Sequence, residues 1–334
     1  MVMIIPKDYK CKLGVLETQK AIKNLKDFFQ TELSKELNLL RVSSPLFVLP
    51  ESGTNDNLSG VETPVSFSVP FLNKKAEIVQ SLAKWKRVAI KKYGIPVEEG
   101  IYADMNAIRK DEELDNIHSF YVDQWDWEYR INKSDRNYEK LVWIVEKIYK
   151  VFKETDMYIS EQYPVFEPML PEHITFVSSQ DLESEWPNLE PKERERRIVK
   201  RHKAVFLTEI GKTLESGEKH DGRSPDYDDW ELNGDFLFYN PTLDDVIELS
   251  SMGIRVDEDS LEKQLEIAGA EDRKNLEYHR LLLNGELPYT IGGGIGQSRI
   301  CMFFLRKAHI GEVQVGIWPK GMIKDCAAAG IDLL

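Results

Sequence analysis

The sequence predicts an α+β fold in which a mainly antiparallel sheet is flanked by helices. Strand-like segments follow one another through charged or turn-rich loops, as neighbouring antiparallel strands do. Helical segments are inserted between groups of strands, whereas a doubly wound parallel sheet requires a helix after nearly every strand. The chain shows no internal repeat, low-complexity tract or linker composition, so residues 1–334 are expected to form a single domain.

The first expected elements are a long helix and short strands. Apolar residues recur with helical spacing over residues 18–40, which predicts a helix of about five turns. Residues 41–48 are expected to form a strand in which Pro45 can sit only at an edge or a bulge. Such an edge beside a long helix suits a dimer surface, and it equally suits an ordinary exposed strand. A turn-rich loop at 51–60, strands at 65–69 and 77–79 and a helix at 80–90 follow.

The middle of the chain contributes a strand with a polar face. Residues 119–128 are expected to form this strand, and side-chain alternation places Gln124, Asp126 and Glu128 on one side of it. Three polar side chains in a row need partners when a strand is interior, and need none when the face is exposed. The other expected elements are strands at 101–109, 174–177, 204–210, 236–240 and 246–250, helices at 138–158, 192–202, 260–268 and 272–284, and a turn-rich acidic loop at 220–234.

A glycine-rich run at 292–299 precedes an apolar stretch with helical spacing. Four glycines allow a backbone to approach a ligand or another backbone, and Arg299 lies at the strand-to-helix junction, where a cation suits a phosphate. The run is not a dinucleotide fingerprint, because Gln297 stands in place of the third glycine. The Gly-Lys-Thr at 211–213 is not a Walker loop, because Phe206 stands where the earlier glycine is required. A turn before a core helix is the alternative for this run.

Composition narrows the class of protein. Of 334 residues, 42% are hydrophobic and 30% are charged, which is typical of a globular protein. We expect no membrane span and no secretory signal, and therefore a cytoplasmic protein. The three cysteines are far apart, which suits neither a disulfide framework nor a zinc cluster. The net charge of −13 opposes binding to nucleic acid.

Several segments together resemble the catalytic core of class II aminoacyl-tRNA synthetases. Pro45 after a long helix is similar to the first motif of those enzymes, residues 108–112 followed by His118 are similar to the second, and 292–299 with the next helix are similar to the third. More closely, five segments in the same order resemble the ammonia-dependent asparagine synthetases, namely residues 54–60, 81–87, 121–128, 225–230 and 248–257.

The resemblance implies an ATP-dependent, Mg²⁺-using ligase that joins ammonia to L-aspartate. In that chemistry the aspartate β-carboxylate attacks the α-phosphate of ATP and releases pyrophosphate, and ammonia then displaces AMP to give L-asparagine. A single catalytic domain and a cytoplasmic homodimer without a nucleic-acid partner are expected with it.

Roles for individual residues follow from the resemblance. Arg109 would hold the α-phosphate and stabilise charge during in-line attack, a task suited to a guanidinium group. Arg299 would pair with the outer phosphates and face the adenine. Glu248, with Asp235 as a weaker candidate, would carry Mg²⁺. The residues expected close to the nucleotide are His118, Ser119 and Val122.

For aspartate, the resemblance places Lys86 and Arg255 at the substrate carboxylates. Ammonium must lose a proton before it attacks, so Asp228 or Asp56 would bind it and accept that proton. The residues expected to receive the α-ammonium are Gln124, Asp126 and Asp56, and those expected to complete the pocket wall are Ser250, Ser251 and Gly293.

Three rival functions are less consistent with the sequence. A tRNA synthetase would normally carry an anticodon-binding module and less acidic charge, whereas here the first motif begins within about 40 residues of Met1. A glutamine-dependent synthetase would start with a catalytic cysteine, and this chain begins Met1-Val2-Met3. A non-catalytic regulatory relative would be expected to lose charged ligands, and here they are present: Arg109, Glu248, Arg255 and Arg299.

Overall fold

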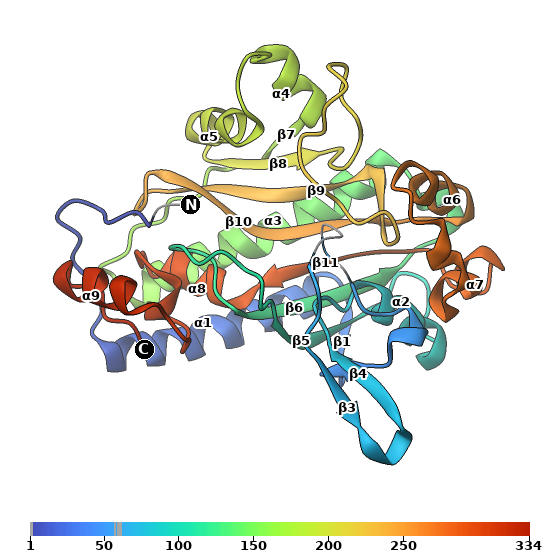
Figure 1. Cartoon of the computed structure of the whole chain (residues 1–334). Helices are drawn as coiled ribbons and strands as arrows, with labels where there is room; N and C mark the ends of the chain where they lie inside the picture. The colour runs from blue at the N-terminus through green and yellow to red at the C-terminus, as the bar shows by residue number, and fades with distance from the viewer. Residues whose placement is uncertain (1–2, 57, 59–61) are drawn as a thin grey trace.

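An eight-stranded sheet organises the computed structural model, which describes residues 3–56, 58 and 62–334. Its strand order is β1-β5-β6-β11-β10-β9-β8-β7 (Figure 1). The pairs at the two edges, β1–β5 and β7–β8, are parallel, and the pairs between them are antiparallel. The predicted α+β class is confirmed. The strands are β1 Leu39–Arg41, β5 Gly100–Ile108, β6 Tyr121–Arg130, β7 Thr175–Ser178, β8 Ala204–Thr208, β9 Asp228–Asn240, β10 Asp245–Arg255 and β11 Thr290–Gly296.

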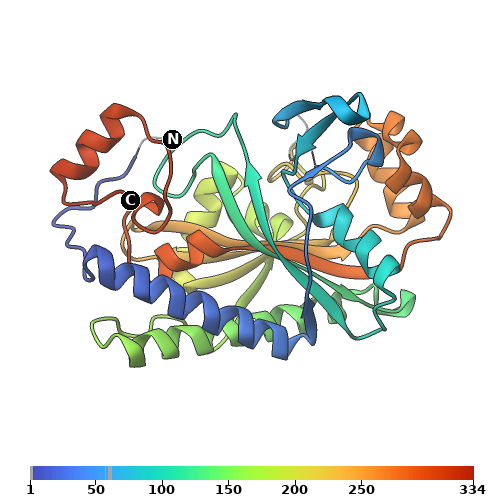
Figure 2. The same cartoon turned by 90° about the horizontal axis from the view of Figure 1, so that it is seen from below.

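Two long helices cover one face of the sheet. Figure 2 shows α1 (Val15–Glu36) and α3 (Tyr138–Gln162) side by side below it. The predicted stripe on α1 faces inward, and Phe29 stacks on Trp125 of β6 with ring centroids 5.0 Å apart. Phe152 of α3 continues the same core. Since Trp125 turns to this apolar side, the alternation of β6 sends Gln124, Asp126 and Glu128 to the opposite face, as the sequence predicted.

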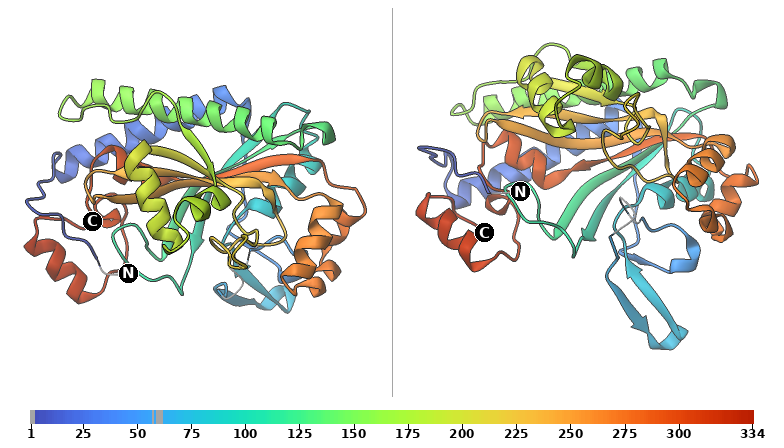
Figure 3. Two further views of the ribbon diagram at one scale, coloured as in Figure 1. Left: turned by 90° about the horizontal axis from the view of Figure 1, so that it is seen from above. Right: turned by 45° about the horizontal axis from the view of Figure 1, so that its top comes forward.

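The opposite face carries shorter elements that surround the candidate site. They include α2 (Ala83–Tyr93), α6 (Glu258–Ile267), α7 (Glu277–Leu283) and a small sheet of β2, β4 and β3, whose β3–β4 hairpin projects from the body (Figures 1 and 2). An insertion with α4 and α5 lies over the β7–β8 edge (Figure 3). The remaining bounds are β2 Phe47–Val48, β3 Ser66–Val69, β4 Lys74–Ile78, α4 Ser179–Glu185, α5 Pro191–His202, α8 Gln297–Phe304 and α9 Lys320–Ala328.

Several element predictions were wrong in detail. Residues 41–48 do not form one strand, because the chain leaves the large sheet after Arg41 and pairs in the small sheet from Phe47. The helix predicted at 272–284 is broken into a 3-10 turn, Glu271–Asn275, and α7. The helices α4 and α9 were not predicted.

The strand β9 begins at Asp228, well before the predicted 236, because this acidic stretch is paired to β10 by backbone hydrogen bonds and to Arg255 by its side chain. In the turn-rich loop at 51–60, the positions 57, 59 and 60 lie outside the described residues. Within the described part of the chain, no helix combines the length and apolar character that a membrane crossing requires.

Candidate active site

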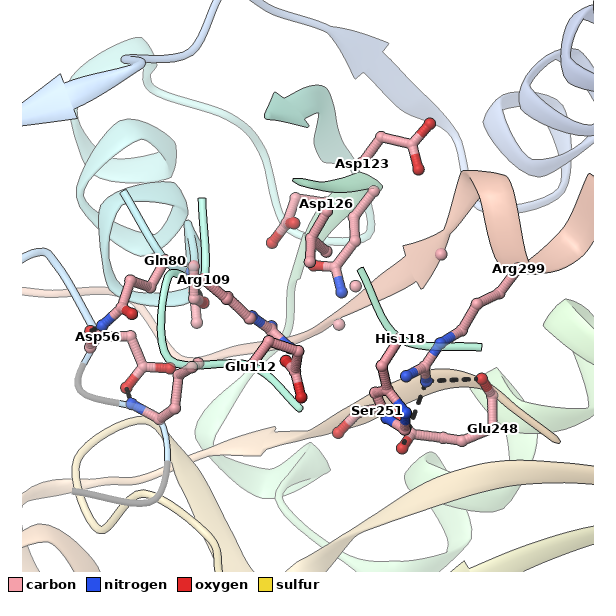
Figure 4. Close-up of a pocket in the computed structure, with 18 of the residues that line it drawn as sticks. Asp56, Gln80, Arg109, Glu112, His118, Asp123, Asp126, Glu248, Ser251 and Arg299 are labelled. Carbon is pink, nitrogen blue, oxygen red and sulfur yellow. Dashed lines mark hydrogen bonds and ion pairs between the residues drawn. The ribbon is translucent and has the colours of Figure 1, made fainter. Parts of the chain in front are cut away.

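A cavity of about 400 Å³ lies over the β6–β11–β10 part of the sheet, on the face opposite to α1 and α3. Side chains converge on it from the loop before β3, from α2, from the end of β5 and from the strands below (Figure 4). It brings together fourteen of the residues that the sequence singled out, while Asp235 and Ser250 are not part of its lining. The fourteen are Asp56, Lys86, Arg109, His118, Ser119, Val122, Gln124, Asp126, Asp228, Glu248, Ser251, Arg255, Gly293 and Arg299.

At the closed end of the cavity, the ammonium of Lys86 is fully engaged by the protein. Lys86 Nζ donates to Asp126 Oδ1 at 2.6 Å, to the carbonyl of Trp127 at 3.0 Å and to the carbonyl of Gly293 at 2.9 Å. Burial lowers the pKa of Lys86, and Asp126 opposes this effect. Asp126 Oδ2 is buried and has no hydrogen-bond partner in the described part of the chain, so this oxygen remains available to a ligand.

Next to Lys86, Arg255 of β10 joins two carboxylates, one from β6 and one from β9. Its Nε and Nη2 atoms donate to Glu128 at 2.8–3.2 Å, and its Nη1 atom pairs with Asp228. Thr290 Oγ1 adds a hydrogen bond to Glu128 at 2.6 Å. Burial raises the pKa of Glu128, but Arg255, together with Lys86 and Thr290, outweighs burial and holds this pKa below its usual value.

The glycines of β11 make room for this network. A Cβ on Gly292 would clash with Glu128 and Arg255, and a Cβ on Gly294 would lie 2.6 Å from Gln124 Oε1. A Cβ on Gly293 would lie 2.6 Å from Met252 Cβ on the far side of the strand. The glycine run therefore accommodates the protein's own charged side chains as well as leaving open backbone at the cavity floor.

Arg223 is a functional candidate that the sequence prediction missed. It lines the cavity, its Nη1 donates to Asp235 Oδ1 at 2.9 Å, and its Nη2 lies 3.1 Å from Asp228 Oδ2. Both oxygens of Asp228 are therefore paired with guanidinium groups. The available signal was that Arg223 is the one lysine or arginine in the acidic residues 220–234.

Asp56, on the loop before β3, differs from Asp228 because only one of its two oxygens is paired in the described part of the chain. Its Oδ1 accepts from the backbone N–H of Leu58 at 3.0 Å, while its Oδ2 is buried and has no hydrogen-bond partner among the residues that the structure describes. Burial raises the pKa of Asp56 to about 6. The loop is fixed by Asn55 and Gln80, since Asn55 Oδ1 accepts from two backbone N–H groups and Gln80 Nε2 donates to the carbonyl of Asp56 at 2.8 Å.

At the open end, two arginines reach the cavity from different elements. Arg299, in the first turn of α8, donates from Nη1 to the carbonyl of Glu248 at 3.0 Å and lies 3.8 Å from its carboxylate. Figure 4 shows His118 beside this pair and Arg109 across the cavity from it. Arg109 Nε is buried, and none of the described residues accepts a hydrogen bond from it.

The two predicted residues outside the cavity lining are displaced for identifiable reasons. The β9–β10 register shifts between Glu248 and Ser250, and this bulge pairs Ser250 with the core residues Phe236 and Ile295. Asp235 is turned to Arg223, and burial raises its pKa to about 6, with a further contribution from Glu248.

Glu248 and Asp235 supply hard oxygen donors of the kind that Mg²⁺ prefers. Among the described residues there is no cluster of three or more metal-binding side chains, so substrate oxygens and water would have to complete such a site.

A family model of aspartate-ammonia ligases matches residues 16–330 of the chain. The chain belongs to the aspartate-ammonia ligase family. A member from Clostridium tetani is 62% identical over 333 residues, covering 99% of this chain and 98% of that protein. A member from Pediococcus pentosaceus is 56% identical over 335 residues and both chains are covered completely. The chain is thus a ligase, and the predicted family is confirmed.

Solved structures confirm the predicted fold. The asparaginyl-tRNA synthetase of Pyrococcus horikoshii, complexed with asparaginyl-adenylate, superposes with a TM-score of 0.64 at 16% identity, over 91% of this chain and 70% of that one. The asparaginyl-tRNA synthetase of Entamoeba histolytica gives a TM-score of 0.63 at 12% identity, over 90% of this chain and 66% of that one. The ligase chain therefore has the class II synthetase catalytic fold and spans about two thirds of the length of those enzymes.

Proposed function

We propose that the cavity makes L-asparagine from L-aspartate, ammonia and ATP through a β-aspartyl-adenylate. The observation that carries this proposal is that buried acidic oxygens and a buried arginine N–H, all without partners in the described part of the chain, lie in one cavity. Counting only partners from the described residues, Asp56 and Asp126 each have an unpaired buried carboxylate oxygen, and Arg109 has an unpaired buried N–H. Buried polar groups require partners, so the two carboxylates favour a ligand with cationic donors and the arginine favours an anionic ligand. Aspartate, ammonium and ATP together provide both.

The chemistry begins with activation, because a carboxylate is a poor electrophile. A β-carboxylate oxygen attacks the α-phosphorus of ATP, the bond to pyrophosphate breaks, and an acyl adenylate results. The nitrogen of ammonia then attacks the acyl carbon and AMP leaves. Arg109 is proposed to stabilise the charge that gathers on the α-phosphate, since its fork-shaped guanidinium lies in the cavity with an unused donor.

The open end of the cavity is proposed to hold the nucleotide. Arg299 would face the adenine and the outer phosphates, and Glu248 beside it, with Asp235 in support, would hold Mg²⁺. When bound, Mg²⁺ neutralises charge on the phosphate oxygens. The side chains proposed to border the adenine are His118, Ser119 and Val122.

The closed end is proposed to hold aspartate. The α-ammonium would meet Asp126 Oδ2 and the Gln124 amide, because Lys86 occupies only the other oxygen of Asp126. Arg255 uses three of its five N–H groups on Glu128 and Asp228, so two remain for a substrate carboxylate. Lys86 contributes positive charge and orients Asp126 while its own protons stay on protein acceptors. The proposed wall of this end is Ser251 and Gly293.

Of the two candidate proton acceptors, Asp56 is better supported than Asp228. Asp228 is held by Arg255 and Arg223 through both oxygens, whereas Asp56 has a buried oxygen to which no described residue donates, and a pKa raised to about 6. A carboxylate with this pKa is ionised at neutral pH, so it can bind ammonium and is basic enough to accept a proton from it. As the pH falls through about 6, Asp56 becomes protonated and the use of ammonium should fall with it.

The proposed reaction is tested with aspartate, Mg²⁺-ATP and ammonium as substrates. Asparagine and AMP should form in equal amounts, and ADP in place of AMP would contradict the adenylate route.

The role of Asp56 is tested by the pair Asp56→Asn and Asp228→Asn, each assayed for asparagine formation and for aspartate-dependent exchange of pyrophosphate into ATP. Asp56→Asn should keep the exchange and lose most of the ammonium-dependent step. A full ammonium-dependent rate in Asp56→Asn would refute the assignment.

Hydroxylamine provides a further control for this assignment. It is largely uncharged near neutral pH and does not require removal of a proton from an ammonium ion before it attacks. Asp56→Asn should therefore retain more activity with hydroxylamine than with ammonium, measured as aspartyl hydroxamate. Equal losses with both nucleophiles would mean that Asp56 does not serve as the proton acceptor.

Transfer to tRNA is the second candidate function, favoured only by the similarity of fold to the tRNA synthetases. The net charge of −13 opposes it, because tRNA binding relies on contacts between cations and phosphates. We propose no nucleic-acid partner. An assay for aspartyl-tRNA with the same ATP and aspartate would distinguish transfer to tRNA from asparagine formation.

A cytoplasmic homodimer is proposed on the edge beside α1, where apolar side chains are exposed near Pro45: Leu40, Leu46 and Phe47. Light scattering in solution would measure its mass. A single catalytic domain over residues 1–334 is part of the same proposal, and it predicts one cooperative unfolding transition.

A further inference from the structure

A buried cluster of charged and titratable side chains lies next to the cavity, and its members Lys84, Asp226, Arg273 and His279 are not part of the cavity lining. Its centre is Asp226, whose carboxylate is inaccessible to solvent. Asp226 Oδ2 accepts from Lys84 Nζ at 3.0 Å, from Arg273 Nη1 at 3.0 Å and from His279 Nε2 at 2.9 Å, and Oδ1 accepts from Ser224 Oγ at 2.8 Å. A carboxylate that is removed from water and has two cationic partners is an unusually concentrated arrangement of charge.

The cluster connects three segments that carry cavity residues. Lys84 belongs to α2, which also presents Lys86, while Asp226 belongs to the segment that presents Arg223 and Asp228. On the third side, α7 packs against the loop of Asp56, because a Cβ on Gly53 would lie 3.2 Å from His279 Nδ1. A change in the cluster should therefore alter both the packing of the Asp56 loop and the electrostatic potential at the Asp56 carboxylate.

Four charged or titratable groups act on Asp56 from the elements around it. Lys84 from α2 and Arg109 from the end of β5 favour its ionised form, whereas Asp226 opposes it. Tyr227 also faces Asp56, and burial together with Asp56 raises the pKa of this tyrosine well above its ordinary value, so it stays neutral. Burial lowers the pKa of His279, so His279 supplies a hydrogen bond to Asp226 without a charge at neutral pH.

We propose that Lys84 and Asp226 are positioning residues that set the pH at which Asp56 can bind ammonium and accept its proton. The inference rests on the proposed role of Asp56 and extends it to residues that touch no substrate. The two members of the pair act in opposite directions, because Lys84 brings positive charge toward the Asp56 carboxylate and Asp226 brings negative charge. Together they keep the carboxylate ionised in the physiological range yet basic enough to take a proton.

Because Lys84 and Asp226 carry opposite charges, their removal should shift the pH dependence of kcat/KM for ammonium in opposite directions. Lys84→Met removes a positive charge, so the acid limb of kcat/KM for ammonium should move to higher pH, by roughly one pH unit. Asp226→Asn removes a negative charge and leaves Lys84 and Arg273 unopposed, so the limb should move to lower pH by a similar amount. The matched control is His279→Gln, which disturbs the same contact without changing charge, so its limb should stay at the wild-type pH even where its rate is reduced.

The measurement is kcat/KM for ammonium from about pH 5 to about pH 8 with the full chain, divided at each pH by aspartate-dependent pyrophosphate exchange. The division removes effects on adenylate formation and on folding. If both charge variants keep the wild-type limb, or shift it in the same direction, the inference is wrong. If Asp226→Asn does not fold, the Lys84→Met profile alone decides the matter.

The Asp56→Asn variant separates this inference from the function on which it rests. If Asp56→Asn keeps the full ammonium-dependent rate, the role of Asp56 itself is wrong. If Asp56→Asn loses that rate while the Lys84 and Asp226 variants leave the limb unmoved, Asp56 keeps its role and only the tuning by Lys84 and Asp226 fails.

Discussion

Two regions of the cavity differ in how completely their buried charged groups are paired within the protein. The paired end is the region around Lys86 and Arg255, and the unpaired end is the region around Asp56 and Arg109. Around Lys86 and Arg255, each buried cation already has carboxylate partners within hydrogen-bonding distance. By contrast, Asp56 Oδ2 and Arg109 Nε are buried and have no hydrogen-bond partner within the described part of the chain. The first arrangement is complete before a ligand arrives, apart from Asp126 Oδ2, and it holds the sheet together, whereas the second is completed by the ligand, and its buried Asp56 carboxylate lowers the stability of the free protein. The paired end should therefore govern folding, and the unpaired end should govern chemistry.

The largest expected effect comes from breaking the paired end. Arg255→Met leaves Glu128 without its hydrogen-bonded guanidinium and leaves Asp228 with Arg223 alone, which should lower the free energy of unfolding by about 3–5 kcal/mol. Urea denaturation measures this loss, and asparagine formation should disappear with it. A loss under about 1 kcal/mol would show that the pairs contribute little and would remove the contrast between the two ends.

Removing the cation of the unpaired end should change chemistry and leave stability alone. Arg109→Gln should slow aspartate-dependent pyrophosphate exchange by about 10²–10³-fold, which is typical for the loss of a donor to a developing oxyanion. The free energy of unfolding should stay within about 0.5 kcal/mol of the wild type. Lys110→Gln is the matched control, since Lys110 is the next residue, is exposed and pairs with Asp111. A similar loss of exchange in Lys110→Gln would point to a general effect of charge.

The smallest effect is a gain in stability that depends on pH. Burial raises the pKa of Asp56 to about 6, so its contribution to stability is complete at low pH and is lost as the pH rises through that value. Asp56→Asn removes the buried charge and should raise the free energy of unfolding by about 1–2 kcal/mol at pH 8, with no gain at pH 4. Urea titrations at both pH values measure this difference.

The control for this stability gain is Asp123→Asn. Asp123 pairs with Lys26 at 2.9 Å, so its replacement should lower stability. A gain in both variants would mean that the comparison between paired and unpaired carboxylates is wrong.

The sequence was sufficient for the parts of the fold and site that depend on periodicity and composition. The apolar stripe of α1 and the alternation of β6, with Trp125 on one face and Asp126 on the other, follow from the order of residues alone. The resemblance to a family supplied the list of cavity residues. Which carboxylate is paired and which is free was beyond both, because Asp228 and Asp56 differ only in the three-dimensional neighbours they acquire.

Other details depended on local backbone geometry that a sequence pattern does not encode. The shift in pairing between Glu248 and Ser250 moves Ser250 to the core, although strand alternation by itself does not predict where a bulge occurs. Arg223 was overlooked because the surrounding acidic loop has no periodicity. The chain brings it to Asp228 and Asp235 only after folding.

The glycine strand β11 also restricts how this enzyme can change its specificity. Where Gly292, Gly293 and Gly294 cross the cavity floor, added side chains would collide with Glu128, Met252 and Gln124. A floor made of main chain has no side chains that mutation can exchange one at a time. New substrate preferences would have to arise from the walls, on α2, β6 and the segment before β9, while the floor remains the same in each variant.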